Sequence, residues 1–176
     1  ILMPVSQGVH FDIILEHRPN DNIFVETGTA LGETTDFGIK HFAYVFSIEY
    51  NQELYWSTFQ RMWFERNLSL IHGDSAFYLP HVEFLCERAA TFFLDAHSVD
   101  EDNIDGYAPS GLTPVERELQ SVLNPDKGHV VFVDDARLFD GKGYPSIDTV
   151  EELSAARKYT FDVVSDIIVL KPKEKK

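Results

Sequence analysis

The chain has 176 residues, with 15 lysines and arginines against 29 acidic residues, which gives a formal net charge of −14. Such a charge repels a phosphate backbone, so the composition disfavours nucleic acid as a partner. Hydrophobic residues make up 44% of the sequence, and the length suits a single domain with its own core. The one cysteine, Cys86, excludes an internal disulfide and a cysteine-built zinc site, and its apolar neighbours predict a core position. No apolar run reaches the ~20 residues of a membrane span and no secretory signal is present, so we expect a cytoplasmic protein without membrane contact.

Helical and extended hydrophobic patterns alternate along the chain. A leading helix over residues 7–17 is expected either to pack on a sheet or to cover a site. Five buried strands alternate with helices behind it, which is typical of a parallel sheet with right-handed crossovers. Two further extended runs, split by Ser165, predict a closing antiparallel hairpin. We divide the domain into a leading segment (1–22), a core (23–170) and a Lys-rich tail (171–176). The predicted strands are Ile23–Glu26, Tyr44–Glu49, Leu68–Ile71, Thr91–Asp95, His129–Val133, Thr160–Val164 and Asp166–Leu170, with helices at about 31–41, 52–63, 76–88, 114–123 and 146–158.

Several predicted helices begin next to capping residues. Asn51 suits the helix after the second strand, and Asp74 or Ser75 suits the helix after the third. Thr113 and Glu116 flank a proline in the pattern of a capping box, in which both residues satisfy backbone N–H groups of the first turn. These positions support the boundaries between strands and helices.

Two long irregular stretches interrupt the alternation. Residues 97–111 form an acidic loop that is too long for a plain connection, and a second loop follows the fifth strand. Long loops in compact domains are usually functional or disordered, so the loop Phe139–Tyr144 is a candidate to face an acceptor. Arg137 is a further candidate, with a surface salt bridge as the favoured alternative. Trp56 and Trp63 recur at helical spacing, and this spacing predicts that they pack in the interior.

The segment Ile23–Thr35 predicts a strand followed by an acid and a glycine turn that opens a helix. A turn of this kind presents backbone N–H groups and a helix N-terminus to a ligand at the carboxyl end of the strand. The spacing is Glu26-x-Gly28-x-x-x-Gly32, which differs from the Gly-x-Gly-x-x-Gly of a pyrophosphate-binding turn. An acid two residues before the first glycine would repel phosphate and suits a cationic ligand.

Acidic residues end the predicted parallel strands. Because the carboxyl ends of parallel strands meet at one edge of the sheet, where ligands bind, these acids should lie on one rim. Unneeded carboxylates gathered there would repel one another, so the rim is expected to bind cations, hydroxyl groups or amines. The rim acids are Glu26, Glu49, Asp95, Asp134 and Asp135, with Asp74 close behind the third strand.

From about Ile23 to Leu170, these motifs and their order resemble the class I S-adenosylmethionine (SAM) methyltransferases. The resemblance implies a Rossmann-like three-layer sandwich, with a mostly parallel seven-stranded sheet, an antiparallel C-terminal hairpin and helices on both faces. It also implies that the glycine turn faces the methionine end of SAM, that Glu49 accepts both ribose hydroxyls and that Asp74 recognises the adenine amino group. A carboxylate is a natural acceptor for a cis-diol, although Asp74 is equally suited to cap a helix. The implied cofactor-binding residues are Glu26, Thr27, Gly28, Thr29, Gly32, Glu49, Asp74, Ser75 and Asp95.

Asp95, His97 and the pair Asp134–Asp135 are expected to converge, because the fourth and fifth strands are neighbours in this fold. The group resembles the metal-dependent small-molecule O-methyltransferases, which implies that Asp95, Asp134 and Asp135 hold Mg²⁺. The metal would bind two vicinal oxygens of the acceptor and lower the pKa of one hydroxyl. His97 is then the candidate general base and Asp95 its catalytic partner. The alternatives are a polar loop histidine, solvated acids at a strand end, and a methyltransferase acid that binds no metal.

The sequence therefore predicts methyl transfer from SAM to an oxygen of a small molecule. One alternative is an NAD- or nucleotide-binding oxidoreductase, against which the turn spacing and Asp74 both count. Another is a non-catalytic protein that retains the fold. Ala30 replaces the middle glycine of the methyltransferase turn, and little sequence precedes the first strand for recognising an acceptor. A partner subunit in a homodimer could supply that missing part.

Overall fold

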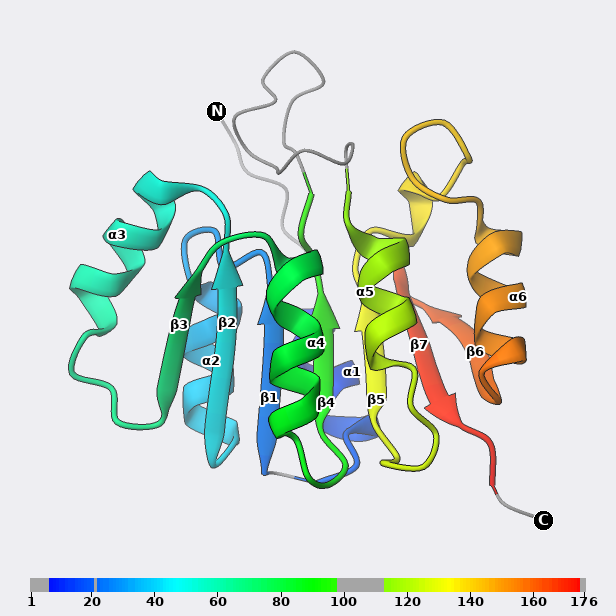
Figure 1. Cartoon of the computed structure of the whole chain (residues 1–176), viewed down its shortest axis with the longest axis horizontal. Coiled ribbons are helices and arrows are strands. Elements are labelled where there is room, and N and C mark those ends of the chain that lie inside the picture. Colours follow the sequence, from blue (N-terminus) through cyan, green and yellow to red (C-terminus); the bar gives the residue numbers. More distant parts are fainter. Residues whose placement is uncertain (1–6, 21, 98–112, 175–176) are drawn as a thin grey trace.

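The computed structural model describes residues 7–20, 22–97 and 113–174, with side chains from residue 11 onward. Seven strands form one sheet in the order β3-β2-β1-β4-β5-β7-β6 (Figure 1). β1 to β5 pair in parallel, whereas β7 runs antiparallel to both β5 and β6, which confirms the predicted sheet and hairpin. The elements are α1 (Gln7–His17), β1 (Ile23–Thr27), α2 (Glu33–His41), β2 (Tyr44–Glu49), α3 (Gln52–Met62), β3 (Leu68–His72), α4 (Ser75–Leu85), β4 (Thr91–Leu94), α5 (Val115–Val122), β5 (Val130–Val133), the 3₁₀ helix η2 (Ala136–Leu138), α6 (Ile147–Ala156), β6 (Tyr159–Val164) and β7 (Ile167–Pro172).

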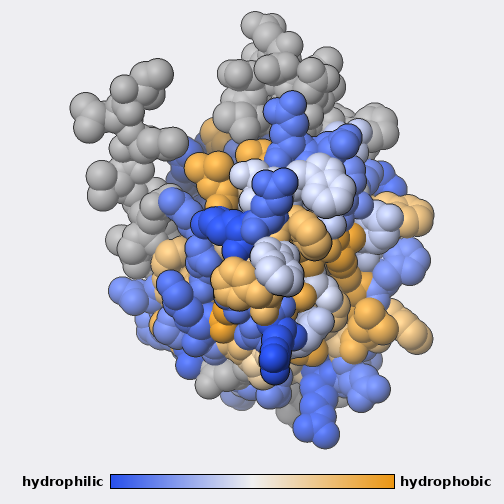
Figure 2. All heavy atoms as spheres, turned by 90° about the vertical axis from the view of Figure 1, so that its left-hand side faces the viewer, coloured by the Kyte–Doolittle hydropathy of each residue, from blue (hydrophilic) through white to orange (hydrophobic). Residues whose placement is uncertain are grey.

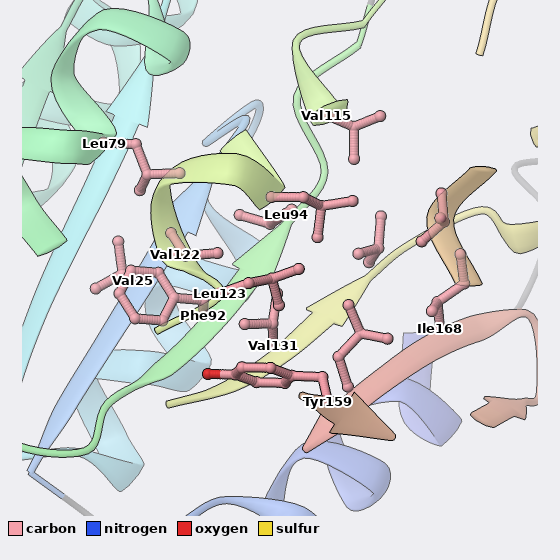
Figure 3. Packing of buried hydrophobic residues seen from close by; sticks show 14 of the residues in the cluster. Val25, Leu79, Phe92, Leu94, Val115, Val122, Leu123, Val131, Tyr159 and Ile168 are labelled. Carbon is pink, nitrogen blue, oxygen red and sulfur yellow. The ribbon is translucent and has the colours of Figure 1, made fainter. Parts of the chain in front are cut away.

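Two hydrophobic layers cover the two faces of the sheet, which confirms the predicted sandwich. On one face, α4, α5 and α6 bury Leu79, Leu119 and Val150 in one cluster with strand residues. Figure 3 shows part of this cluster, with Leu79 and Val122 beside Phe92 of β4. Cys86 is fully buried in the same cluster, as its neighbours predicted. On the other face, α1 and α2 pack on strand residues that alternate with those of the first face, because successive side chains of a strand point to opposite sides.

The leading helix α1 packs on the sheet. Ile13 and Ile14 are buried in the second cluster together with Phe24 of β1. Phe11 stacks on Phe37 of α2, with 4.4 Å between the ring centroids. The structure therefore favours packing over the alternative in which this helix covers a site.

The helix starts agree with the predicted caps except at α5. The side chain of Asn51 accepts hydrogen bonds from Glu53 and Leu54, and that of Asp74 accepts one from the N–H of Ala76. At α5 the predicted capping box is wrong, because the helix begins at Val115 with Pro114 as its N-cap. Thr113 still accepts a bond from the N–H of Val115 at 3.2 Å, but the Glu116 carboxylate accepts from Gln120 one turn further on.

The predicted packing role of the tryptophans is wrong. Trp56 is 48% exposed and Trp63 is 71% exposed. The buried side of α3 consists of Thr58 and Met62, which lie against the glycine turn at Gly32. Because these residues occupy the inner face, the tryptophans at the other helical positions point outward.

Among the helices of the described residues, none combines the length and the apolar character that crossing a bilayer requires. Most of the acidic stretch 97–111 lies outside the described residues, so its predicted role stays a prediction.

Candidate functional site

The carboxyl ends of β1, β2, β4 and β5 lie side by side on one rim of the sheet (Figure 1). Glu26 is paired in register with Ser47 of β2 and with Phe93 of β4. The chain order reverses between β1 and β4, and ligands of open α/β sheets bind in the crevice at such a switch point. The predicted placement of the strand-end acids on this rim is therefore found in the structure.

The glycine turn after β1 is bound closely to both neighbouring strands. Gly28 donates its N–H to the carbonyl of Ile48 at 2.9 Å and has φ of 81°. A Cβ at this position would lie 2.5 Å from the backbone oxygen of Asp95, so only glycine allows the turn to approach β4 so closely. The requirement for Gly28 thus comes from the backbone conformation and from the packing against Asp95.

Glu26 lies beneath this turn and is only 1% exposed. Its Oε2 accepts hydrogen bonds from the hydroxyls of Thr35 and Ser47, both at 2.5 Å. Burial outweighs these bonds and raises the pKa of Glu26 to about 8, so the carboxyl is largely neutral near pH 7. The sequence suggested that Glu26 is an anion facing a cationic ligand. In the structure, burial favours a neutral carboxyl, whose hydrogen bonds link β1 to β2 and α2.

Thr29 extends this buried polar network, with its hydroxyl 2.6 Å from that of Ser47. Neither Ser47 nor Thr35 belongs to the predicted site. Ser47 could have been identified from the sequence, since it is a polar residue between apolar residues of a buried strand. Thr35 carries none, because a threonine in the first turn of a helix is common.

Glu49 presents an oriented carboxylate at the end of β2. Its Oε2 accepts the N–H of Ala30 at 2.8 Å, and its Oε1 accepts the N–H of Asn51 at 2.7 Å. Burial raises the pKa of Glu49, and the backbone bonds partly offset this effect. Each oxygen of a carboxylate has two lone pairs, so both oxygens retain capacity for a ligand hydroxyl.

Asp74 follows β3 and caps α4, where its Oδ1 accepts the N–H of Ala76 at 2.9 Å. The adjacent Ser75 is buried at the first position of the helix. Capping therefore accounts for one oxygen of Asp74, and a contact between this residue and adenine stays a prediction.

Asp95, His97 and Asp135 form a compact group of potential metal ligands. One ligand atom from each residue lies within 4.8 Å of the others. His97 Nδ1 is 3.3 Å from Asp95 Oδ1, and its Nε2 is 3.9 Å from Asp135 Oδ2. The hydrogen bond that His97 donates to the Asp95 carboxylate and the charges of Asp95 and Asp135 raise the pKa of His97 despite its burial. The geometry therefore suits either an imidazolium between two carboxylates or a shared cation.

Asp135 has the left-handed conformation, with φ of 58°, which is uncommon for a residue with a side chain. Its Oδ1 pairs with Arg137 at 2.7 Å, and Arg137 also pairs with Asp166. Arg137 thus orients Asp135, in agreement with the salt-bridge alternative for this arginine. Asp134 differs from the prediction, because its Oδ1 accepts the N–H of Asp135 and the carboxylate lies outside the compact group.

A small pocket opens between the ends of β4 and β5 next to this group. The predicted loop after β5 contributes Phe139 and Tyr144, whose rings meet edge to face at 5.2 Å. The hydroxyl of Tyr144 is buried without a hydrogen-bond partner in the described part of the chain. The polar residues lining the pocket are Asp95, His97, Thr113, Glu118, Asp134 and Tyr144.

Glu118 is a further acid of this pocket that the sequence did not indicate as part of the site. It is fully buried, and neither oxygen has a hydrogen-bond partner within the described residues. The hydroxyls of Ser75 and Thr27 lie near enough to lower its pKa, but burial dominates and raises it to about 7. A signal was present, because Glu118 lies between Val115 and Val122 on the apolar stripe of α5.

Glu118→Gln should remove part of the pH dependence of stability. The neutral carboxyl of Glu118 stabilises the fold fully below its ordinary pKa of 4.5, and this stabilisation is lost as the pH rises through about 7. The difference between these two pKa values corresponds to about 3 kcal/mol of unfolding free energy. The Glu118→Gln variant would not lose this stabilisation as the pH rises, because glutamine does not ionise. Urea unfolding of both proteins across this pH range measures the effect. Equal pH slopes for the two proteins would show that Glu118 ionises normally.

The chain is similar in structure to methyltransferases, although its sequence matches no protein-family model and no curated protein. A protein from Streptococcus mutans assigned as a methyltransferase, solved with SAH, aligns with a TM-score of 0.64 at 10% identity over 97% of this chain and 99% of that chain. An rRNA methylase assigned in Clostridium thermocellum aligns with a TM-score of 0.63 at 12% identity, covering 97% and 98% of the two chains. A protein from Staphylococcus aureus assigned as a caffeoyl-CoA O-methyltransferase has a TM-score of 0.56 at 15% identity, covering 99% and 85%. At these identities the likeness establishes the Rossmann-like methyltransferase fold.

Proposed function

We propose that this protein is a SAM-dependent methyltransferase that methylates an oxygen of a small molecule. The observation that carries the proposal is the Glu49 carboxylate, held at the end of β2 by the N–H groups of Ala30 and Asn51. Two oriented oxygens in the switch-point crevice suit the vicinal hydroxyls of a ribose. The fold shared with the structural neighbours supports the same cofactor, since one of them was solved with SAH.

The contact between Glu49 and the glycine turn also argues against a dinucleotide. A pyrophosphate bound at such a turn uses its backbone N–H groups as donors. Here the N–H of Ala30 already donates to Glu49, and the carboxylate would repel a phosphate placed beside it. The oxidoreductase alternative is therefore disfavoured by a specific bond.

Asp95, His97 and Asp135 have the donor atoms to bind a divalent cation. Carboxylate oxygens suit Mg²⁺ and Mn²⁺, and the three candidate ligand atoms lie within 4.8 Å of one another. A cation at this position would supply Lewis acidity that lowers the pKa of an acceptor hydroxyl. Arg137 would keep Asp135 in place through the ion pair at Oδ1.

Where Asp95 and Asp135 hold the cation without the imidazole, His97 would take up the acceptor proton. Asp95 fixes the imidazole through Nδ1, and Nε2 points toward Asp135. Without a cation the two carboxylates favour the imidazolium form, which accepts no proton. Positive charge bound to these carboxylates would weaken that preference, so that His97 becomes neutral and accepts a proton at Nε2.

When bound, SAM supplies a methyl group that its sulfonium already activates. The residues around it therefore need mainly to align the acceptor oxygen and to remove its proton. His97 would take up the hydroxyl proton as the acceptor oxygen is methylated. Aromatic rings of Phe139 and Tyr144 would line the acceptor side of the pocket.

The acceptor that fits this site best is a small molecule. Among the described residues, the pocket lining includes acids and aromatic rings but no lysine or arginine, and the whole chain has a net charge of −14. RNA remains the alternative to test, since three of the structural neighbours are described as rRNA methylases or methyltransferases. An RNA acceptor would have to overcome the repulsion between its phosphates and this charge.

Isothermal titration calorimetry with SAM, with NAD as the control ligand and each with and without Mg²⁺, tests the cofactor. We expect SAM to bind in both conditions and NAD in neither. Binding of NAD alone would support the oxidoreductase, and failure of SAM to bind in any condition would contradict the proposal. A ribosomal RNA fragment that binds at physiological salt would replace the small molecule as acceptor. SAM binding without turnover on any acceptor class would support the non-catalytic alternative.

A further inference from the structure

The outer side of α3 is an exposed aromatic surface at one edge of the molecule. It consists of Trp56 and Phe59 on α3, Trp63 and Phe64 immediately after the helix, and Leu31 of the glycine turn, and we call it the α3 aromatic face. These side chains are between 40% and 71% exposed, and both tryptophans of the chain are among them. Figure 2 views this edge and shows apolar and aromatic residues gathered there, with hydrophilic residues between and around them.

Contacts within the α3 aromatic face hold it in a fixed shape. Trp56 meets Phe59 edge to face at 5.5 Å between ring centroids, and Trp63 meets Phe64 at 6.2 Å. The guanidinium of Arg61 donates to the carbonyl of Leu31, which joins the helix to the turn. The side chains are thus arranged before any partner binds, which lowers the entropic cost of association.

The area of the α3 aromatic face fits a contact between two proteins. An aromatic side chain presents roughly 150–250 Å², so at the observed exposures the face offers on the order of 500 Å² of apolar surface per chain. This area lies within the range of about 300–600 Å² that the largest apolar patch of a typical monomer covers, and such patches are often functional. Two such faces together approach the ~1,000 Å² that distinguishes a specific interface from a chance contact.

The charge on this surface favours a second copy of the same chain. The chain carries a net charge of −14, so two copies repel each other unless their contact surface is neutral. Over residues 52–66 the formal charges cancel, and an anionic membrane would find no excess of positive charge there. The charged residues of this segment are Glu53, Arg61, Glu65 and Arg66.

The neighbouring edge strand β3 also lacks protection. Within the described residues it pairs only with β2, and all of its residues are at least partly exposed. Natural edge strands usually carry charges or proline that prevent pairing with another chain. β3 contains no lysine, arginine, acid or proline, and its one ionisable residue is the exposed His72 at its end.

We propose that this protein forms a homodimer in which two α3 aromatic faces pack together across a two-fold axis, beside the β3 edges. A two-fold interface places the same patch on both partners, so a neutral, self-complementary aromatic surface suits it. If the proposed function holds, the dimer would also brace α3 next to Glu49, because Asn51 both caps this helix and donates its N–H to that carboxylate.

Sedimentation velocity from sub-micromolar to high protein concentration tests the proposal. We expect a reversible monomer–dimer equilibrium, accompanied by a blue shift of tryptophan emission as the dimer forms. The variants Trp56→Phe and Trp63→Phe each leave one tryptophan and so report on the two positions separately. Trp63→Glu should raise the dimer Kd by at least about thirtyfold, equivalent to an interface hot spot of about 2 kcal/mol.

Phe84→Glu is the matched control, because Phe84 is 78% exposed on α4 and the change in charge is the same. This variant should dimerise as the parent protein does, and circular dichroism should show both variants folded. A protein that is monomeric at every concentration would overturn the proposal. So would a dimer that Trp63→Glu leaves intact, or binding of the parent protein to lipid vesicles without self-association. None of these measurements depends on SAM binding.

Discussion

Glu49→Ala should lower the affinity for SAM by at least about a hundredfold. In the proposed complex the carboxylate accepts both ribose hydroxyls, and each such charge-assisted bond contributes about 1.5–3 kcal/mol. A change of about 1.4 kcal/mol corresponds to a tenfold change in Kd, so the loss of both bonds should raise the Kd for SAM more than about a hundredfold. Calorimetric titration of the parent protein and the variant with SAM measures this loss.

The same substitution removes the acceptor for the N–H groups of Ala30 and Asn51, so its structural effect needs a separate control. Asn51→Ala provides one, because it deletes the cap that accepts bonds from Glu53 and Leu54 but keeps the carboxylate. Loss of a cap costs about 1 kcal/mol, so this variant should melt earlier and still bind SAM within a few-fold of the parent protein. Equal loss of SAM binding in both variants would show that the position of α3, rather than the carboxylate, controls affinity.

The sheet could be predicted because its signals are local. Each of the five parallel strands is a short apolar run bounded by turn residues. Because the connections between parallel strands are right-handed, only a few sheet topologies are possible for such strands and helices. The strand-end acids could be placed on one rim for the same reason, since parallel strands all end on the same side. The hairpin followed from the split at Ser165, which has φ of 48° in the turn between β6 and β7.

The protonation of the site could not be predicted, because it depends on burial and on partners distant in sequence. Glu26 is neutralised beneath a turn by desolvation, and its hydroxyl partners lie 9 and 21 residues away on α2 and β2. His97 receives its raised pKa from Asp95 and from Asp135, which belongs to a different strand end. Sequence spacing identifies the residues that can titrate but contains no information on how far each is removed from water.

The exposure of α3 was mispredicted for a related reason. Helical spacing shows that Trp56, Phe59 and Trp63 share a side of the helix, but it does not show which side faces the sheet. The choice is made by Gly32, where an added Cβ would already lie within 3.1 Å of Thr58. Thr58 and Met62 occupy the side of α3 that meets this turn, so the aromatic side turns outward.

Asp135→Asn should weaken Mn²⁺ binding strongly. Loss of a residue that only hydrogen-bonds to a metal ligand costs about 10–100-fold in affinity, and the loss of a ligand itself should exceed this. Asp135 contributes one of the three converging ligand atoms, and asparagine removes its negative charge while conserving its shape. Titration with Mn²⁺, followed by the electron paramagnetic resonance of the free ion, measures the affinity without knowledge of the acceptor. Asp140→Asn, on the exposed loop after β5, is the matched control and should leave the affinity unchanged.

Asp134→Asn distinguishes the two candidate ligand sets. The sequence placed Asp134 on the metal beside Asp95 and Asp135, whereas the structure brings His97 into the group and leaves the Asp134 carboxylate bonded to the N–H of Asp135. An asparagine oxygen can accept the same bond, so we expect Asp134→Asn to change Mn²⁺ affinity by no more than a few-fold. A loss as large as that of Asp135→Asn would restore the ligand set expected from the sequence. If the parent protein binds no Mn²⁺, the His97 imidazolium is the charge that balances Asp95 and Asp135, and His97 in that form would not serve as the base.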